Sequence, residues 1–231
     1  MKRFVTLITI LVLAMAIPAS TAGADFPDVG LGHWAFAEIS EMTERGILNG
    51  YPDGTIRLEK TVTRAEFAKL LVLASGLDAT PTNTMSFSDV SDKARYHPYV
   101  ESAKSYLHGY TQGGQAVFFP DAPARREEVA EALVLLKGYD LFGVDKSRIQ
   151  AMVSDYDTIS GSARLYVAVV VERGLIRGYP DGTFRARSSI TRAEPVAMLC
   201  RAFPIPVTGI RGLYSSVLCG KITKKSPEKN R

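Results

Sequence analysis

Gly50-Tyr-Pro-Asp-Gly-Thr55 is the most informative part of this chain, because it returns unchanged at Gly178-Tyr-Pro-Asp-Gly-Thr183. Each copy leads to the same tetrapeptide, Thr63-Arg-Ala-Glu66 and Thr191-Arg-Ala-Glu194, whose Arg stands 14 positions after the first Gly of the hexapeptide. Two identical pairs of motifs in one register indicate a repeat protein, and a repeat sets the whole architecture. We therefore expect its function to depend on repeated surfaces.

A third, degraded copy lies between the two clean ones, which are 128 positions apart. Phe26-Pro-Asp-Val29 is answered there by Phe87-Ser-Asp-Val90, and Arg125-Arg-Glu-Glu128 stands in place of the tetrapeptide. The middle copy has no Pro-Asp-Gly, and it has Tyr96-His97-Pro98 near the position of His33-Trp34-Ala35. We predict repeats at residues 25–78, 86–140 and 152–203, of which the middle one is divergent.

Each repeat has the pattern of a helix, a turn-rich loop and a second helix. In the first repeat an apolar stripe at helical spacing runs up to Gly46, a residue suited to ending a helix. Pro52-Asp53-Gly54 is a turn signal, because Pro presets φ, Asp bonds back to the backbone and Gly accepts a left-handed conformation. Asp53 and its counterpart Asp181 are therefore predicted to be turn formers.

The tetrapeptide marks the start of the second helix. Thr63 and Glu66 have the spacing of a capping box, and Thr191 and Glu194 repeat it. These four residues are predicted to cap their helices. Pro195 removes one early backbone donor in the last repeat, which predicts a strained helix start there.

One repeat alone is too small to bury much core. Three such units bury one by sharing their helices. The sequence therefore predicts an all-α fold in which three tandem helix-loop-helix repeats form one compact assembly.

The first residues read as an export signal. Lys2 and Arg3 precede a mostly apolar run, and small residues precede a cut at Asp25, so residues 1–24 are predicted to be a signal peptide. The apolar run is shorter than the about 20 residues that a membrane-spanning helix needs. No other segment is apolar enough, so we expect a secreted protein without a membrane span in the mature chain.

The formal net charge of +4 arises from the ends of the chain. The basic C-terminal tail, residues 204–231, carries the excess, and the repeat region is slightly acidic. This distribution argues against a nucleic-acid partner, which requires a basic face on the folded part. Cys200 and Cys219 allow one disulfide, or a buried thiol at Cys200 beside an unrelated Cys219, and the sequence leaves both open.

No motif of catalysis or metal binding is present. His33, His97 and His108 are the three histidines, and they have no nucleophile in a recognisable setting. There is no phosphate-binding Gly-rich loop and no metal-ligand spacing. We expect no catalytic residue, no metal, no cofactor and no enzymatic activity.

The ordered series of Phe-Pro-Asp-Val, His-Trp-Ala, Gly-Tyr-Pro-Asp-Gly-Thr and Thr-Arg-Ala-Glu resembles the S-layer homology domain. The resemblance implies three repeats in a pseudo-threefold helical spindle. It also implies an anchoring protein of the cell wall or S-layer that binds secondary cell-wall polysaccharide, often pyruvylated. In some related proteins the ligand is modified peptidoglycan.

The resemblance further implies binding grooves between neighbouring repeats that use the Arg of the tetrapeptide. A guanidinium meets a compact anion with two parallel hydrogen bonds, and an aromatic ring covers the apolar face of a sugar. Backbone groups of the Gly-Tyr-Pro-Asp-Gly turns complete such a groove. The ligand-binding residues predicted in this way are Arg64, Arg192, Trp34, Arg126, Gly50 and Gly178.

The departures from the family pattern leave a second possibility open. The middle repeat lacks the turn motif, and the third repeat has Ser162 in place of the Trp. The chain is then a surface assembly protein that uses the same scaffold to bind another surface protein without binding a glycan.

Overall fold

The computed structural model describes residues 26–204, so the predicted signal peptide, Cys219 and nearly all of the basic tail lie outside the described residues. This part of the chain is mostly helical, which confirms the predicted all-α repeat fold. In chain order its elements are α1 (Phe36–Glu44), α2 (Arg64–Ser75), α3 (His97–Ala103), β1 (Tyr110–Gln112), β2 (Gln115–Val117), α4 (Arg126–Lys137), α5 (Lys146–Met152), η1 (Tyr156–Thr158), α6 (Arg164–Glu172) and α7 (Ala193–Ala202).

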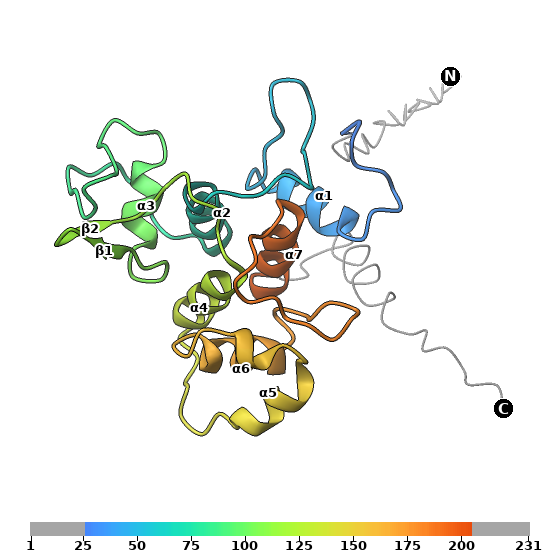
Figure 1. Cartoon of the computed structure of the whole chain (residues 1–231). Coiled ribbons are helices and arrows are strands. Elements are labelled where there is room, and N and C mark those ends of the chain that lie inside the picture. Colours follow the sequence, from blue (N-terminus) through green and yellow to red (C-terminus); the bar gives the residue numbers. More distant parts are fainter. Residues whose placement is uncertain (1–25, 205–231) are drawn as a thin grey trace, which may run out of the picture.

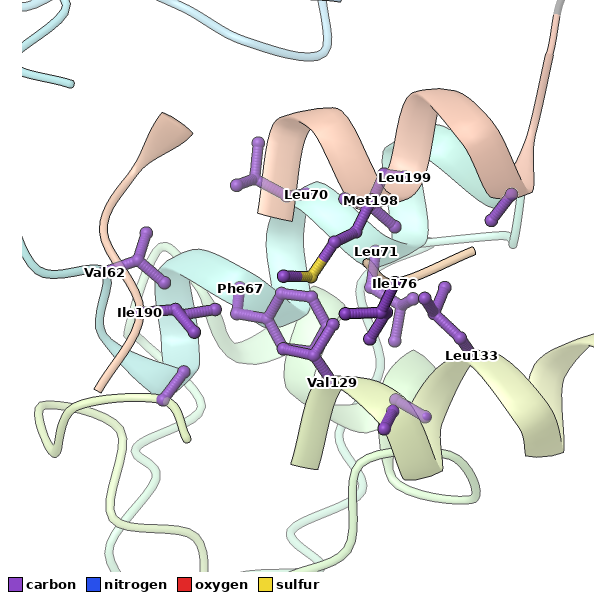
Figure 2. Close-up of a cluster of buried hydrophobic side chains, with 14 of the residues drawn as sticks. Val62, Phe67, Leu70, Leu71, Val129, Leu133, Ile176, Ile190, Met198 and Leu199 are labelled. Atoms are coloured by element: carbon purple, nitrogen blue, oxygen red, sulfur yellow. The ribbon is translucent and has the colours of Figure 1, made fainter. Parts of the chain in front are cut away.

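The second helices of the three predicted repeats, α2, α4 and α7, converge at the centre of the molecule (Figure 1). Their apolar side chains meet in one cluster, which Figure 2 shows around Phe67. Phe67 itself has no exposed surface, and the same holds for Leu133 of α4 and Leu199 of α7. Because the three repeats contribute to one core, none of them buries its apolar face alone.

A closed ring of backbone hydrogen bonds joins the segments that lead into these helices. The Val62 N–H donates to the Ile190 carbonyl at 3.1 Å, the Ile190 N–H to the Ala124 carbonyl at 3.1 Å, and the Ala124 N–H to the Val62 carbonyl at 3.0 Å. Each segment is therefore both donor and acceptor to its neighbours. The three segments thus form equivalent backbone hydrogen bonds, as a pseudo-threefold arrangement requires.

The first N–H groups of α2 and α4, and the N–H groups at and just before the start of α7, bond to the next repeat. Such groups have no partner within their own helix. Here they donate to carbonyls of the loop of the following repeat, and the last repeat donates back to the first. The bonds run from Arg64 to Ala122, from Ala65 to Pro120, from Arg126 to Ser188, from Glu127 to Ala186, from Arg192 to Lys60 and from Ala193 to Leu58.

Helix packing also joins neighbouring repeats. Helix α3 packs on α2, α6 packs on α4, and α1 packs on α7. In each pair the first helix of one repeat lies on the second helix of the repeat before it, and the first helix of the chain lies on the last. Each of these helix pairs, which we call a lobe, is therefore built by two repeats.

A carboxylate holds each outer loop in place. It accepts hydrogen bonds from two consecutive backbone N–H groups, and the second of these residues has a left-handed φ between 55° and 57°. The carboxylates with their donors are Asp28 with Ile56 and Arg57, Asp89 with Phe118 and Phe119, and Asp155 with Phe184 and Arg185.

The hairpin of the middle repeat and helix α5 were not anticipated. The loop of the middle repeat is a β-hairpin in which β1 pairs with β2, and its turn consists of Gly113 and Gly114 with φ of 58° and 79°. Two consecutive residues with positive φ form the turn that matches the twist of a hairpin. Helix α5 lies between the predicted second and third repeats, and the Asp145 side chain caps it by accepting from the Ser147 N–H at 2.9 Å.

The two clean tetrapeptides start their helices differently. Thr63 and Glu66 form a complete capping box on α2. In α7 the first helical residue is Ala193, so the N-cap position falls on Arg192, which makes no side-chain cap bond. The Glu194 carboxylate still accepts from the Thr191 N–H at 2.7 Å. Pro195 lies in the first turn of α7, where a backbone N–H has no partner within the helix.

Candidate functional site

Each tetrapeptide arginine reaches across to the next repeat, and in each case Nη2 donates to the carbonyl two positions before a tyrosine. The guanidinium lies 4.8–5.2 Å from the centre of that tyrosine ring. We name the three places by their arginines. The Arg64 junction contains Tyr110 and Glu128, the Arg126 junction contains Tyr179 and Glu194, and the Arg192 junction contains Tyr51 and Glu66.

The Arg64 junction is closed by an internal carboxylate. Arg64 Nη1 forms an ion pair with Glu128 Oε1, and the Tyr110 hydroxyl donates to the same oxygen. Arg64 Nε donates to the Phe118 carbonyl at 2.8 Å, and Arg64 is 2% exposed. Its guanidinium is therefore used within the protein.

The Arg126 junction repeats this arrangement. Arg126 Nη1 lies 3.1 Å from Glu194 Oε1, and the Tyr179 hydroxyl donates to that oxygen. Burial and the hydrogen bond to Glu194 raise the pKa of Tyr179 to about 12. The tyrosine therefore remains a hydrogen-bond donor at neutral pH.

The Arg192 junction contains the same types of residue, but its arginine and tyrosine are not bonded to the glutamate. Glu66 Oε2 accepts from the Thr63 N–H at 3.0 Å, but within residues 26–204 Glu66 Oε1 has no hydrogen-bond partner and Arg192 forms no ion pair. The Tyr51 hydroxyl instead accepts from Lys60 Nζ at 3.0 Å. Arg192 keeps its bond to the Asn49 carbonyl, and its Nε is buried without a partner in the described region, as is that of Arg126.

A cavity of about 500 Å³ lies at the Arg192 junction and is the candidate site, the Arg192 groove. Repeat 3 supplies Arg192, and repeat 1 supplies the turn around Tyr51. Repeat 2 adds Arg95, Tyr96 and Tyr99 from the start of α3. The lining residues used below are Gly50, Tyr51, Glu66, Lys69, Arg95, Tyr96, Tyr99, Asp121 and Arg192.

The Arg192 groove combines positive charge with aromatic surface. Three cationic side chains, of Lys69, Arg95 and Arg192, face two carboxylates, and three tyrosines lie among them. Lys69 Nζ lies 5.8 Å from the centre of the Tyr99 ring. Such a lining suits a ligand that presents both an anionic group and apolar C–H faces.

A second cavity, of about 390 Å³, lies at the Arg64 junction. Arg125 and Arg187 line it together with Tyr110 and Glu128. Because Glu128 forms an ion pair with Arg64 and also accepts from the Tyr110 hydroxyl, the most buried charge in this cavity is already neutralised.

Three of the predicted ligand-binding residues meet in these two cavities: Arg192 and Gly50 line the larger one, and Arg64 lines the smaller one. A Cβ at Gly50 would come within 3.0 Å of the Phe26 ring, so the turn approaches the first motif closely. Trp34 does not line either cavity; it is 54% exposed and lies against His33 with ring centres 5.6 Å apart.

The remaining predicted residues lie in turns and helix starts. Asp53 accepts from the Thr55 N–H at 3.0 Å, and Asp181 accepts from the Thr183 N–H at 2.9 Å. Bonds from the threonine hydroxyl and from an arginine hold the pKa of both carboxyls well below the ordinary range. Gly178 opens the second of these turns, and a Cβ there would lie 3.1 Å from the Thr183 carbonyl oxygen.

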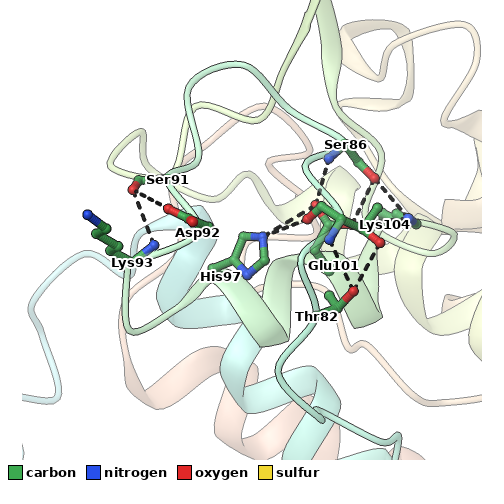
Figure 3. A network of polar contacts seen from close by, with 9 residues as sticks. Thr82, Ser86, Ser91, Asp92, Lys93, His97, Glu101 and Lys104 are labelled. Carbon is green, nitrogen blue, oxygen red and sulfur yellow. Dashed lines mark hydrogen bonds and ion pairs between the residues drawn. The ribbon is translucent and has the colours of Figure 1, made fainter.

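The most buried histidine is in a structural network. His97 Nε2 lies 2.8 Å from the Thr84 carbonyl oxygen, and Glu101 accepts from the Ser86 N–H at 2.8 Å (Figure 3). Lys104 Nζ bonds to the Ser86 hydroxyl and to Glu101. These bonds join the segment before α3 to the helix itself, and Tyr96, just before α3, and Tyr99, within it, both line the Arg192 groove.

Two further observations concern the described residues as a whole. Within 26–204, no cluster of His, Cys, Asp and Glu side chains is arranged to hold a metal ion. In the same range no helix has the length and apolar character needed to cross a membrane. Cys200 is buried and its Sγ lies 3.1 Å from Glu41 Oε2. Cys219 lies outside the described residues, so both possibilities for this pair of cysteines stay open.

The residues that sequence reasoning missed are Tyr51, Lys60, Lys69, Arg95, Tyr96 and Tyr99. Tyr51 belongs to the hexapeptide but was read as part of a turn. Tyr96 and Tyr99 are three positions apart at the start of a helix, a spacing that places both on one face. That spacing was available as a signal, but their proximity to Arg192 follows only from the packing of α3 on α2.

Comparison with known proteins identifies the family that the motifs resemble. Residues 25–68 and 154–194 match the family described as "S-layer homology domain". A cellulosome-anchoring protein of Acetivibrio thermocellus is 32% identical over 160 residues, which are 67% of this chain and 35% of that protein. The S-layer protein EA1 of Bacillus anthracis is 27% identical over 82% of this chain and 21% of its own length.

The relatives include enzymes. An amylopullulanase of Thermoanaerobacterium thermosulfurigenes is 32% identical over 72% of this chain, but the match covers 9% of the enzyme. The chain thus spans about a third of the cellulosome-anchoring protein and smaller shares of the other two relatives.

Proposed function

The chain carries S-layer homology domains, and from this premise we infer that it is a non-catalytic anchoring module of the bacterial cell surface. We propose that it binds an anionic secondary cell-wall polysaccharide in the Arg192 groove. The observation that carries the proposal is that Arg192 forms no ion pair in the described structure, although it lines a cavity that also contains tyrosines and two further cations. The names of the relatives, an anchoring protein and an S-layer protein, support a location in the cell wall or S-layer.

The chemistry of the groove fits a glycan with a compact anion such as a ketal-linked pyruvate. The Arg192 guanidinium provides directed donors for a carboxylate, and such charge-assisted bonds are stronger than neutral ones. The tyrosine rings provide flat apolar surface for the C–H faces of a sugar. Backbone groups near Gly50 lie at the same wall and complete the recognition of hydroxyl groups.

Co-sedimentation with purified cell walls tests this proposal. We expect residues 25–204 to sediment with intact walls and to stay in solution after acid stripping of the secondary polymer. Retention on stripped walls would instead indicate peptidoglycan as the ligand. A failure to sediment with either preparation would contradict glycan binding and favour the surface assembly alternative.

The variant Arg192→Ala tests whether Arg192 contacts the ligand. Loss of a charge-assisted contact worth about 1.5–3 kcal/mol should weaken wall binding by about ten- to a hundredfold. Arg173→Ala removes the same charge from an exposed position over Tyr139 and is the matched control. Equal binding by the two variants would exclude Arg192 from the ligand contact.

A further inference from the structure

The three junctions contain the same types of residue, an arginine, a tyrosine and a glutamate. They differ in whether one oxygen of the glutamate is bonded to the other two residues. Oε1 of Glu128 and Oε1 of Glu194 each accept from an arginine and from a tyrosine hydroxyl. In the described structure the matching oxygen of Glu66 accepts from neither Arg192 nor Tyr51. Each glutamate uses its other oxygen in the same way, as acceptor for the N–H three residues earlier. Because this bond at the helix start is the same in all three repeats, it does not explain why Glu66 Oε1 is not bonded to Arg192.

The contacts of the three tyrosines show one difference between the Arg192 junction and the other two junctions. An arginine stacks on Tyr51 at 4.2 Å and on Tyr179 at 4.0 Å, so that contact is common to an unclosed and a closed junction. The hydroxyl of Tyr51 alone of the three accepts a bond from a lysine, at 3.0 Å from Lys60 Nζ. Lys60 stands four positions before the repeat's arginine, and the equivalent residues are Ala122 and Ser188. Neither of these short side chains reaches a tyrosine hydroxyl in this way.

We propose that Lys60 is a positioning residue that holds the Tyr51 hydroxyl away from Glu66 and thereby keeps the Arg192 groove accessible. A bond from an ammonium group is charge-assisted and fixes the ring more firmly than a neutral bond does. Without it, Tyr51 and Arg192 are free to converge on Glu66 Oε1, as their counterparts do at the other junctions. The groove then closes on an internal carboxylate in place of a ligand's anion. The binding consequence rests on the proposed function; the structural consequence does not.

The variant Lys60→Ala, which copies the middle repeat, tests the proposal. Its crystal structure should show the Tyr51 hydroxyl and Arg192 both bonded to Glu66. Sedimentation with purified walls should weaken by about tenfold or more, since an internal ion pair must be broken before the ligand binds. Lys60→Ser, which copies the third repeat, should behave in the same way. Circular dichroism should stay that of the parent chain, because the Lys60 carbonyl that accepts from the Arg192 N–H is retained.

A second substitution separates positioning from direct contact. In Lys60→Ala/Tyr51→Phe the ring has no hydroxyl to donate to Glu66, so wall binding should recover to within about threefold of the Tyr51→Phe single variant. A lysine that touches the ligand would leave the double variant as weak as Lys60→Ala, and that outcome would overturn the proposal. Lys60→Ala/Glu66→Gln should recover as well, because Gln still caps α2 but offers Arg192 no charge.

Different outcomes would contradict the proposal of glycan binding and the proposal of a positioning role for Lys60. If the parent chain does not sediment with walls, the glycan function fails, and the crystal structure of Lys60→Ala still decides the role of Lys60. If that structure shows Tyr51 and Glu66 apart, the positioning role is wrong even where wall binding by the parent chain is established.

Discussion

At the scale of the residue, Arg64 is surrounded by groups of the next repeat. Its donors are taken by two carbonyls and by Glu128, and aromatic rings lie at 4.6 Å and 5.0 Å from the guanidinium. A buried ion pair stabilises little relative to an apolar replacement, but breaking one by removing a single partner is costly. The repeated arginine thus has two uses in this chain. All three arginines bond to a carbonyl of the next repeat, but Arg64 and Arg126 also pair with a glutamate there, whereas we propose that Arg192 contacts the ligand.

Removing Arg64 should therefore destabilise the fold. Arg64→Ala leaves Glu128 with a largely buried charge, since its side chain is 12% exposed. We expect a loss of about 3 kcal/mol in the free energy of unfolding, measured by urea denaturation. Arg192→Ala, which breaks no ion pair in the described structure, should lose no more than about 1 kcal/mol. Equal losses would show that the two arginines have the same structural role.

The sequence predicted these residues better than it predicted their environments. The repeated motif identified the three arginines and the capping pair Thr63 and Glu66, because local motifs carry local chemistry. It did not show that Arg64 is enclosed, since enclosure comes from Glu128 and Tyr110 at sites 64 and 46 positions further along the chain. Nor did it show the part of Lys60, which depends on which way the Tyr51 ring turns.

At the scale of the element, the hairpin of the middle repeat replaces the Pro-Asp-Gly turn of the other two. The sequence showed that Pro-Asp-Gly is missing there but did not predict a hairpin. In the structure the positive φ angles of Gly113 and Gly114 make the tight turn between β1 and β2. The hairpin carries Tyr110, so this divergence still delivers a tyrosine to the Arg64 junction.

Gly109 is the residue on which the hairpin depends most. A Cβ there would lie 2.3 Å from the Phe87 ring and 2.6 Å from the Val117 carbonyl oxygen. Gly109→Ala should therefore cost about 1–3 kcal/mol in the free energy of unfolding, as overpacking does. Gly161→Ala is the control, because a Cβ at Gly161 meets nothing within 4 Å. A Gly109→Ala variant as stable as the control would mean that the hairpin relaxes at no cost.

At the scale of the whole molecule, the packing of α1 on α7 closes the three repeats into a cycle. The sequence predicted three repeats that share their helices in one compact assembly. It did not show that the first helix of each repeat packs on the second helix of the repeat before it, since amphipathic stripes show which face is buried and not against which partner. The domain boundaries inferred from the motifs stay predictions of the repeat unit, not of the folding unit.

A cycle with one core should unfold as one unit. Phe67→Ala, at the centre of the shared core, should lower the free energy of unfolding by about 3–5 kcal/mol. Trp34 fluorescence and far-ultraviolet circular dichroism should report the same midpoint in urea, although the single Trp lies in the first repeat. Leu31→Ala, at a side chain that is 85% exposed, should leave the midpoint nearly unchanged. Two separated transitions would contradict the cyclic core.

The bond from Arg192 to the Asn49 carbonyl spans 143 positions of the chain. The residues that line the Arg192 groove are therefore brought together from distant parts of the chain, and contacts of such wide sequence separation are slow to form. The groove exists only when the third repeat has docked on the first. A chain that ends before Arg192 has the first set of motifs but lacks the groove, so under the proposed function only a finished molecule attaches to the wall.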